Sequence, residues 1–173
     1  HPPVAQDGKE PGRPQRGGKR SKAISMSELQ NLSAGRHRIP NIAHRGGAGL
    51  WPENTMHAFR RALALGVDGF ELDVHVTRDG EIAVYHDEAL KPDITRDAMG
   101  AWVARKDLLL KDMTFAELQA YDVGRLKPGT KYAAEHPEQM AADGERIPHL
   151  RDVIRLVKGT PLMKRVSPMG MIS

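Results

Sequence analysis

Short apolar runs separated by one helical segment limit residues 39–87 to a fold that mixes strands and helices. The first run, 39–43, is followed over 54–66 by apolar residues at helical spacing. Asn54 or Thr55 can cap this helix, and Gly66 ends it. Two further runs, 69–77 and 81–87, alternate apolar and polar residues with the two-residue period of a strand. The order strand, helix, strand, strand predicts an α/β fold. The short link between the last two strands leaves their relative direction open.

The second half of the chain carries fewer regular elements. Thr114 and Glu117 have the spacing of a capping box, which predicts a short helix after Thr114. Leu150, Ile154 and Val157 are spaced to form the apolar face of an amphipathic helix near the end of the chain. Two polar stretches rich in turn-forming residues are expected to be irregular: 90–113 and 124–148.

Composition separates the start of the chain from the rest. Residues 1–25 are rich in Pro, Gly, Lys and Arg and hold almost no large apolar side chain, which predicts a disordered basic tail. The net charge of +4 lies entirely in the first 24 residues, so the remainder carries no net charge. Nucleic-acid-binding domains usually carry a basic patch on the fold itself. We therefore expect no nucleic acid on the fold, and a globular domain over 39–173.

Membrane and redox signals are absent from the printed sequence. No apolar run approaches the roughly 18 residues that a membrane span needs, which predicts no transmembrane segment. The chain has no cysteine, so disulfides and thiolate metal sites are excluded. No apolar signal-peptide core follows the basic residues, which favours a cytoplasmic location.

Two carboxylates share one face of the strand predicted over 69–77. Glu71 and Asp73 are two residues apart, so both side chains project to the same side. The apolar residues of this strand project to the other side: Phe70, Leu72, Val74 and Val76. Two inward carboxylates are costly unless they are paired or bind a metal, and carboxylate oxygens suit a hard cation such as Mg²⁺ or Ca²⁺. The alternative is a solvent-exposed polar face, which antiparallel sheets commonly have.

Two histidines and an arginine stand at the ends of the predicted strands. His44 ends the first strand and His86 ends the third, and histidine exchanges protons near neutral pH. Arg45, beside His44, offers a planar fork of donors that matches a phosphate. A single histidine at a strand end is more often an ordinary surface or core residue. Together with the two carboxylates, however, these residues predict metal-assisted phosphoryl or phosphodiester hydrolysis.

Four motifs in register resemble the glycerophosphodiester phosphodiesterase family. The motifs are His44-Arg45-Gly46-Gly47, Pro52-Glu53-Asn54-Thr55, Glu71-Leu72-Asp73-Val74 and His86-Asp87. The resemblance covers roughly residues 39–158 and implies a distorted TIM barrel. It also implies the substrate class, glycerophosphodiesters such as glycerophosphocholine, which are hydrolysed to glycerol 3-phosphate and an alcohol.

The resemblance assigns a role to each motif. It implies that His44 and His86 form the acid–base pair, that Glu71 and Asp73 bind a divalent cation, Ca²⁺ or Mg²⁺, and that Arg45 holds the phosphate. Two further residues are expected to line the site or to brace the loop after the first strand: Glu53 and Asn54. Three aromatic residues lie in or beside the long loops where family members build their substrate cover: Trp102, Tyr121 and Tyr132.

The chain departs from the family pattern in its length and its last segment. A TIM barrel typically takes about 250 residues, so we expect an incomplete barrel with roughly the first three to four of eight strands. The family places a third acidic ligand after the last predicted helix, where residues 159–173 contain no Asp or Glu. We therefore expect weak or no turnover, low solubility and self-association through an open barrel edge. Two alternatives stay open: an inactive fragment that at most binds metal or phosphate, and a phospholipase D-like relative that acts on lysophospholipids.

Overall fold

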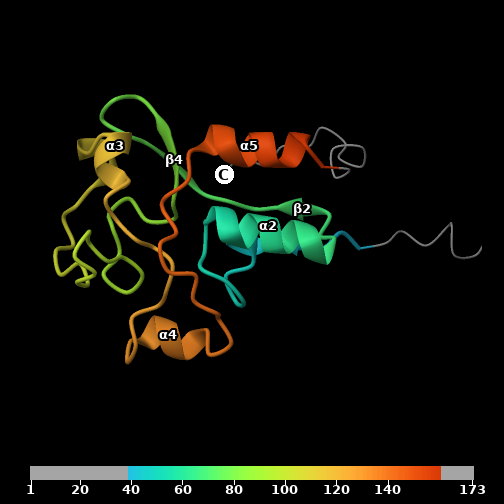
Figure 1. Cartoon of the computed structure of the whole chain (residues 1–173), viewed down its shortest axis with the longest axis horizontal. Coiled ribbons are helices and arrows are strands. Elements are labelled where there is room, and N and C mark those ends of the chain that lie inside the picture. Colours follow the sequence, from blue (N-terminus) through green and yellow to red (C-terminus); the bar gives the residue numbers. More distant parts are fainter. Residues whose placement is uncertain (1–38, 161–173) are drawn as a thin grey trace, which may run out of the picture. The chain divides into compact units, whose positions relative to one another are not determined.

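The computed structural model describes residues 39–160 of the chain (Figure 1). Contacts divide the chain into two units, His1–Arg38 and Ile39–Ser173, and all described residues belong to the second unit. The predicted basic tail, 1–25, lies outside the described residues, and so does the terminal segment 161–173. None of the helices within 39–160 has the length and apolar character needed to cross a membrane.

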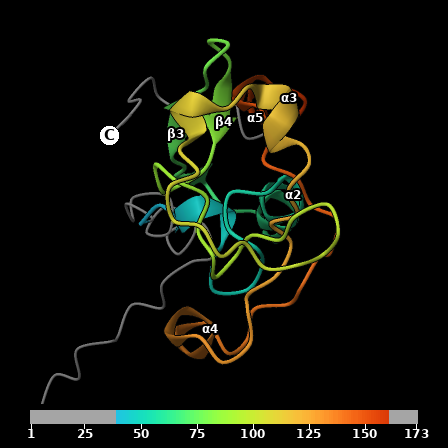
Figure 2. The ribbon, with the colours of Figure 1, turned by 90° about the vertical axis from the view of Figure 1, so that its left-hand side faces the viewer.

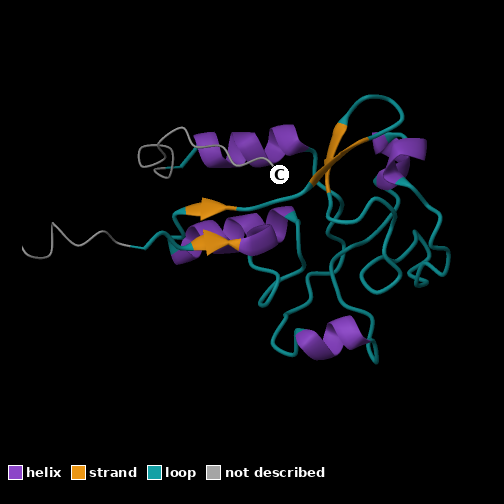
Figure 3. Ribbon diagram, turned by 180° about the vertical axis from the view of Figure 1, so that it is seen from behind, coloured by secondary structure: helices purple, strands orange, loops and turns teal. Residues whose placement is uncertain are grey.

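The described residues confirm the α/β class. The strands are β1 (Ile42–Ala43), β2 (Gly69–Phe70), β3 (Val74–Val76) and β4 (Ile82–Val84). The α-helices are α2 (Met56–Leu65), α3 (Phe115–Leu118), α4 (Lys131–Glu135) and α5 (Leu150–Lys158). Two single turns of 3₁₀ helix are η1 (His44–Gly46) and η2 (Leu110–Asp112). β1 and β2 pair in parallel, whereas β3 and β4 form an antiparallel hairpin (Figure 3).

The prediction of one continuous strand over 69–77 is wrong, because the chain changes its pairing partner between Glu71 and Asp73. The amide of Glu71 donates to the carbonyl of Ala43 at 3.0 Å, which extends the pairing with β1. The backbone carbonyl of Asp73 instead accepts from the backbone amide of Tyr85 at 3.0 Å, which begins the pairing with β4. The two acidic residues therefore stand where the strand passes from one sheet to the other.

The predicted helix after the first strand is confirmed as α2, with the expected signals at both ends. The Thr55 side chain caps it by accepting from the amide of Ala58, and Gly66 ends it in a left-handed conformation with φ 75°. The ring of Phe59 is fully buried and lies 5.1 Å, centroid to centroid, from the ring of Phe70 in β2. The Phe59 face of α2 thus packs against β2.

The last two predicted helices form, but one of them buries a different face. The capping box of α3 is present, because Thr114 and Glu117 bond reciprocally. In α5 the buried residue is Val153, and Ile154 is 45% exposed, so the predicted apolar face is correct at Leu150 and wrong at Ile154. The residues of α5 that pack on the core are Leu150, Val153 and Leu156, so the helix is rotated about its axis relative to the prediction.

Side chains from distant segments meet in the core. Phe59 of α2, Val84 of β4 and Val153 of α5 form one buried cluster, and Phe70, Leu72 and Val74 pack against it as the strand alternation predicted. Val76 departs from that pattern and is 60% exposed. Figure 2 shows the hairpin, α3 and α5 at one end of the described residues and α4, which lies in the stretch expected to be irregular, at the other.

A partly buried ion pair organises the long loops. Arg96 Nη2 donates to Asp122 Oδ2 at 2.5 Å, and the same carboxylate accepts from the amides of Gly124 at 2.8 Å and Gly144 at 3.0 Å. Asp143 accepts from Arg96 at 2.7 Å and also from Arg125. These charge-assisted hydrogen bonds fix segments that local sequence patterns leave irregular.

The loop network predicts acid sensitivity. The hydrogen bond from the Arg125 guanidinium, with Arg96 nearby, lowers the pKa of Asp143 below its ordinary value of 3.8. A lowered folded-state pKa gives stability that is complete above the unfolded-state value and is lost as the pH falls toward the folded-state value. We expect the urea midpoint to be constant between pH 7 and about pH 5 and to fall below about pH 4. The Asp143→Asn variant should lose part of this dependence, and an equally steep decline in that variant would contradict the assignment.

Candidate active site

The loop after β1 adopts a left-handed path that aims Arg45 into the molecule. Arg45, Gly46 and Gly47 all have positive φ, at 49°, 77° and 105°. A Cβ on Gly46 would lie 2.9 Å from the Phe59 ring, so glycine allows the loop to pack on α2. The left-handed conformation of a non-glycine residue such as Arg45 persists only where its surroundings hold it in place.

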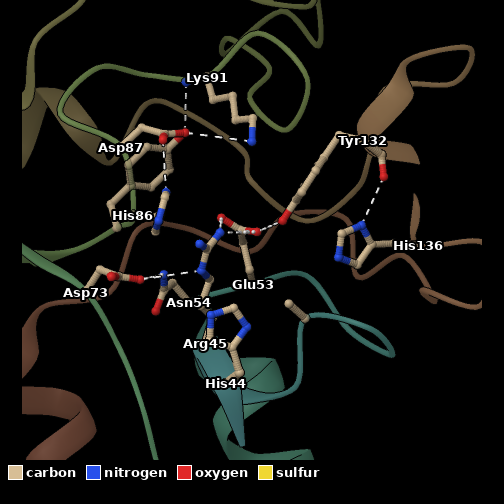
Figure 4. A network of polar contacts seen from close by, with 12 residues as sticks. His44, Arg45, Glu53, Asn54, Asp73, His86, Asp87, Lys91, Tyr132 and His136 are labelled. Carbon is tan, nitrogen blue, oxygen red and sulfur yellow. Dashed lines mark hydrogen bonds and ion pairs between the residues drawn. The ribbon is translucent and has the colours of Figure 1, made fainter. Parts of the chain in front are cut away.

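Acidic residues surround Arg45 (Figure 4). Its Nη1 donates to both carboxylate oxygens of Glu53, at 3.2 and 3.3 Å, and its Nε lies 3.6 Å from Asp73 Oδ2. Its backbone amide donates to Glu71 Oε2 at 3.0 Å. The side chains of Arg45 and Glu53 are only 15% and 3% exposed. Nε is buried and makes no hydrogen bond to a described residue, and the charged group beside it is the Asp73 carboxylate.

Asn54 links the loop after β1 to the strand crossover. It too has a positive φ, 53°, and its amide donates to the carbonyl of Arg45 at 2.9 Å. Its Nδ2 donates to Asp73 Oδ2 at 3.3 Å. Its Oδ1 is buried and has no hydrogen-bond partner among the described residues. The contacts of Asn54 therefore join Arg45 to Asp73 through both backbone and side chain.

The two histidines differ in their surroundings. His44 is 68% exposed, and its Nε2 lies 3.8 Å from Glu71 Oε2. His86 Nδ1 lies 2.9 Å from Asp87 Oδ1. Because a carboxylate only accepts hydrogen bonds, this contact favours the tautomer with the proton on Nδ1 and leaves Nε2 of the neutral ring with a free lone pair.

The antiparallel hairpin is what returns His86 to this region. Val74 pairs with Val84, so the end of β4 lies beside the start of β3. His75 Nε2 also contacts the carbonyl of His86 at 3.0 Å. His86 therefore follows a strand that runs back toward the Glu71–Asp73 crossover, an arrangement that the spacing of the sequence left open.

The predicted metal ligands suit a hard cation but form only part of a coordination sphere. Among residues 39–160, no three His, Asp or Glu side chains are grouped so that they could hold a metal ion. Glu71 and Asp73 both contact Arg45, through its amide and its guanidinium. Two carboxylates are a sufficient protein contribution for Mg²⁺ that keeps water molecules and binds substrate phosphate oxygens. By the chemistry of their oxygen donors, Glu71 and Asp73 therefore fit a hard divalent cation.

Three further residues belong to this network: Asp87, which stands in one of the four motifs, Tyr132, which was expected beside the substrate cover, and Lys91, which had no assigned role. The Tyr132 hydroxyl donates to Glu53 Oε2, Lys91 Nζ lies 3.8 Å from the centroid of the Tyr132 ring, and Asp87 Oδ2 lies 3.9 Å from Lys91 Nζ. Tyr132 and Glu53 are 79 positions apart, so no local pattern could have joined them. The position of Tyr132 in a long loop was its only signal.

Comparison with known proteins places most of the chain in one enzyme family. The glycerophosphoryl diester phosphodiesterase family matches residues 44–168. A glycerophosphodiester phosphodiesterase from Caldanaerobacter subterraneus subsp. tengcongensis is 42% identical over 116 residues, which cover 67% of this chain and 39% of that protein. The human lysophospholipase D GDPD1 is 37% identical over 122 residues, covering 70% of this chain and 34% of the human protein.

A solved structure shows the same arrangement of the backbone. The crystal structure of a candidate glycerophosphoryl diester phosphodiesterase from Silicibacter pomeroyi superposes with a TM-score of 0.69 at 37% identity, covering 72% of this chain and 42% of that one. The chain belongs to the glycerophosphoryl diester phosphodiesterase family. It spans about two fifths or less of the length of these relatives.

Proposed function

We propose that the chain hydrolyses glycerophosphodiesters to glycerol 3-phosphate and an alcohol. The observation that carries the proposal is the setting of Arg45, a partly buried guanidinium whose Nε makes no hydrogen bond to a described residue, held by Glu53 beside the acidic residues of the strand crossover. A phosphodiester carries one negative charge, and a guanidinium with free donors is the side chain best matched to its oxygens. Family membership supplies the substrate class.

The two histidines are proposed to move the protons. His86, with Nδ1 on Asp87, takes a proton at Nε2 from the water molecule that attacks the phosphorus atom. His44, exposed and within 3.8 Å of Glu71, gives a proton to the departing alkoxide. Arg45 orients the phosphoryl group, and Glu71 and Asp73 would hold a divalent cation, Ca²⁺ or Mg²⁺. When bound, that cation supplies Lewis-acid polarisation of a phosphoryl oxygen.

We also propose that the described residues are the first part of a TIM barrel. A hollow of about 350 Å³ lies along β1 between Asn41 and Leu50, and its walls are mostly apolar. Ile42 and Leu65, which line it, are 52% and 66% exposed. Among the described residues β1 pairs with β2 alone, so its other edge is unpaired, and an unpaired strand edge pairs readily with another chain. Self-association through this edge, like the cytoplasmic location, stays a prediction.

The test is an assay of the full 173-residue chain with glycerophosphocholine in the presence of Ca²⁺, Mg²⁺ or EDTA. We expect slow release of glycerol 3-phosphate that requires a divalent cation and is lost in the Arg45→Ala variant. Release that persists in EDTA and in Arg45→Ala would contradict the proposed function. A parallel assay with lysophosphatidylcholine separates this substrate from the lysophospholipid alternative.

One observation favours the alternative of an inactive fragment. Among residues 39–160, no group of three acidic or histidine side chains is placed to hold a metal ion, so only two carboxylates are available as ligands. This alternative predicts that calorimetry detects binding of Ca²⁺ or inorganic phosphate while the glycerophosphocholine assay detects no product. Binding without turnover would therefore replace the enzyme proposal with the fragment alternative for this chain.

A further inference from the structure

We propose that Tyr132 is a positioning residue which, through Glu53, fixes the orientation of the Arg45 guanidinium. The identity of the anion that Arg45 receives rests on the proposed function, whereas the effect of Tyr132 on Arg45 does not. The assignment gives the loop segment that contains α4 a role in the candidate site, although Tyr132 follows Glu53 by 79 positions in the sequence.

The first step in the argument is the buried charge of Glu53. Its side chain is 3% exposed, and an isolated buried carboxylate is strongly disfavoured. Two groups compensate it, the Nη1 of Arg45 and the hydroxyl of Tyr132, which donates to Oε2. Without the tyrosine hydroxyl, Arg45 would be the only side chain donating to this carboxylate among the described residues.

The second step is that Tyr132 is itself held from several sides (Figure 4). Thr130 caps α4 by accepting from the amide of Ala133, which places Tyr132 in the first turn. Lys91 Nζ stands 3.8 Å from the ring centroid, an attractive cation–π geometry. The ring of His136 lies 4.5 Å away, centroid to centroid, and its Nδ1 contacts the carbonyl of Tyr132 at 3.0 Å. Because these contacts restrict the conformations of the Tyr132 side chain, it loses little conformational entropy when its hydroxyl binds Glu53.

The third step concerns what Arg45 needs in order to bind an anion. Its Nη1 is engaged by Glu53, its Nε is buried without a hydrogen bond, and its Nη2 makes no hydrogen bond to any residue in 39–160. The guanidinium is planar, so fixing Nη1 fixes the direction of the remaining donors. If the Glu53 carboxylate turns, those donors turn with it and no longer converge on one oxygen pair.

The test uses the full chain and the Tyr132→Phe variant, which removes the hydroxyl and keeps the ring under Lys91. NMR relaxation of the Arg45 ¹⁵Nε–¹Hε group reports the order of the guanidinium without any ligand. Titration with inorganic phosphate reports the anion affinity. We expect a clear loss of Arg45 order in Tyr132→Phe and about tenfold weaker phosphate binding, because a hydrogen bond to a charged group is lost.

Tyr121→Phe is the matched control, because Tyr121 is also partly buried and packs against the same core cluster as Tyr132. It should leave Arg45 order and phosphate affinity unchanged. In a Glu53→Gln background, Tyr132→Phe should cause no further loss of Arg45 order or phosphate affinity. If Tyr132 only stabilised the fold, its replacement would lower both quantities in that background as well.

Unchanged Arg45 order in Tyr132→Phe, or an equal loss in Tyr121→Phe, would overturn the assignment. Failure of the proposed function has a different signature. In that case the unaltered chain shows no phosphate binding that depends on Arg45, while the order of the guanidinium still responds to the Tyr132 hydroxyl and supports the positioning role.

Discussion

Replacing His86 with alanine should lower kcat for glycerophosphocholine by about 10²- to 10⁴-fold, the range that general acid–base catalysis by one side chain contributes. The reason is local. Asp87 holds Nδ1 at 2.9 Å, so the ring presents Nε2 in one orientation, and alanine removes the only proton acceptor on that side chain. Because Arg45 keeps its partners Glu53 and Asp73, KM should change little.

The control for this prediction is His57→Ala, which removes a histidine from α2 without altering the network around Arg45. Its turnover should equal that of the unaltered chain, and both variants should bind inorganic phosphate with the original affinity. If His86→Ala and His57→Ala have the same kcat, His86 is not the proton acceptor. A loss of phosphate affinity in His86→Ala would show instead that the histidine supports binding.

The second large effect is expected at Gly124, where Gly124→Ala should lower the free energy of unfolding by about 3 kcal/mol. A Cβ on Gly124 would lie 1.9 Å from the carbonyl oxygen of Ala142, and both are backbone-fixed positions. The two segments cannot separate cheaply, because the amide of Ala142 donates to the carbonyl of Gly124 at 2.7 Å. Separation would also pull Gly144 away from the Asp122 carboxylate, which it contacts at 3.0 Å.

Urea denaturation followed by circular dichroism measures this change, with Gly49→Ala as the matched variant. A Cβ on Gly49 meets no heavy atom within 4 Å, and Gly49 has no positive φ, so its midpoint should stay close to that of the unaltered chain. Equal midpoints for Gly124→Ala and Gly49→Ala would mean that the 124–142 contact is not tight in solution.

Local patterns predicted the elements that depend on neighbouring residues. The Thr55 cap and the Gly66 end of α2, and the capping box of α3, form as expected because each involves residues within a few positions of one another. The apolar alternation of Phe70 and Leu72 was also correct, since a strand presents alternate residues to its two faces.

The same patterns failed where a distant segment decides the outcome. The interruption of the strand at Glu71 depends on which strand its neighbours pair with, and the face of α5 depends on where Val153 meets the core. The helix α4 lies in a stretch that local composition marked as irregular. In each case tertiary contacts outweighed a weak local preference.

The sequence by itself determined the chemical groups of the candidate site and the family to which the chain belongs. Four residues could be singled out because they follow a predicted strand or share one face of a strand, in motifs of fixed spacing: His44, Arg45, Glu71 and Asp73. Only the tertiary structure decided how these groups are held. Tyr132 reaches Glu53 across 79 positions, and the antiparallel hairpin returns His86 toward the strand crossover. Contacts of this kind come from chain topology and the burial of charge, to which no short-range pattern is sensitive.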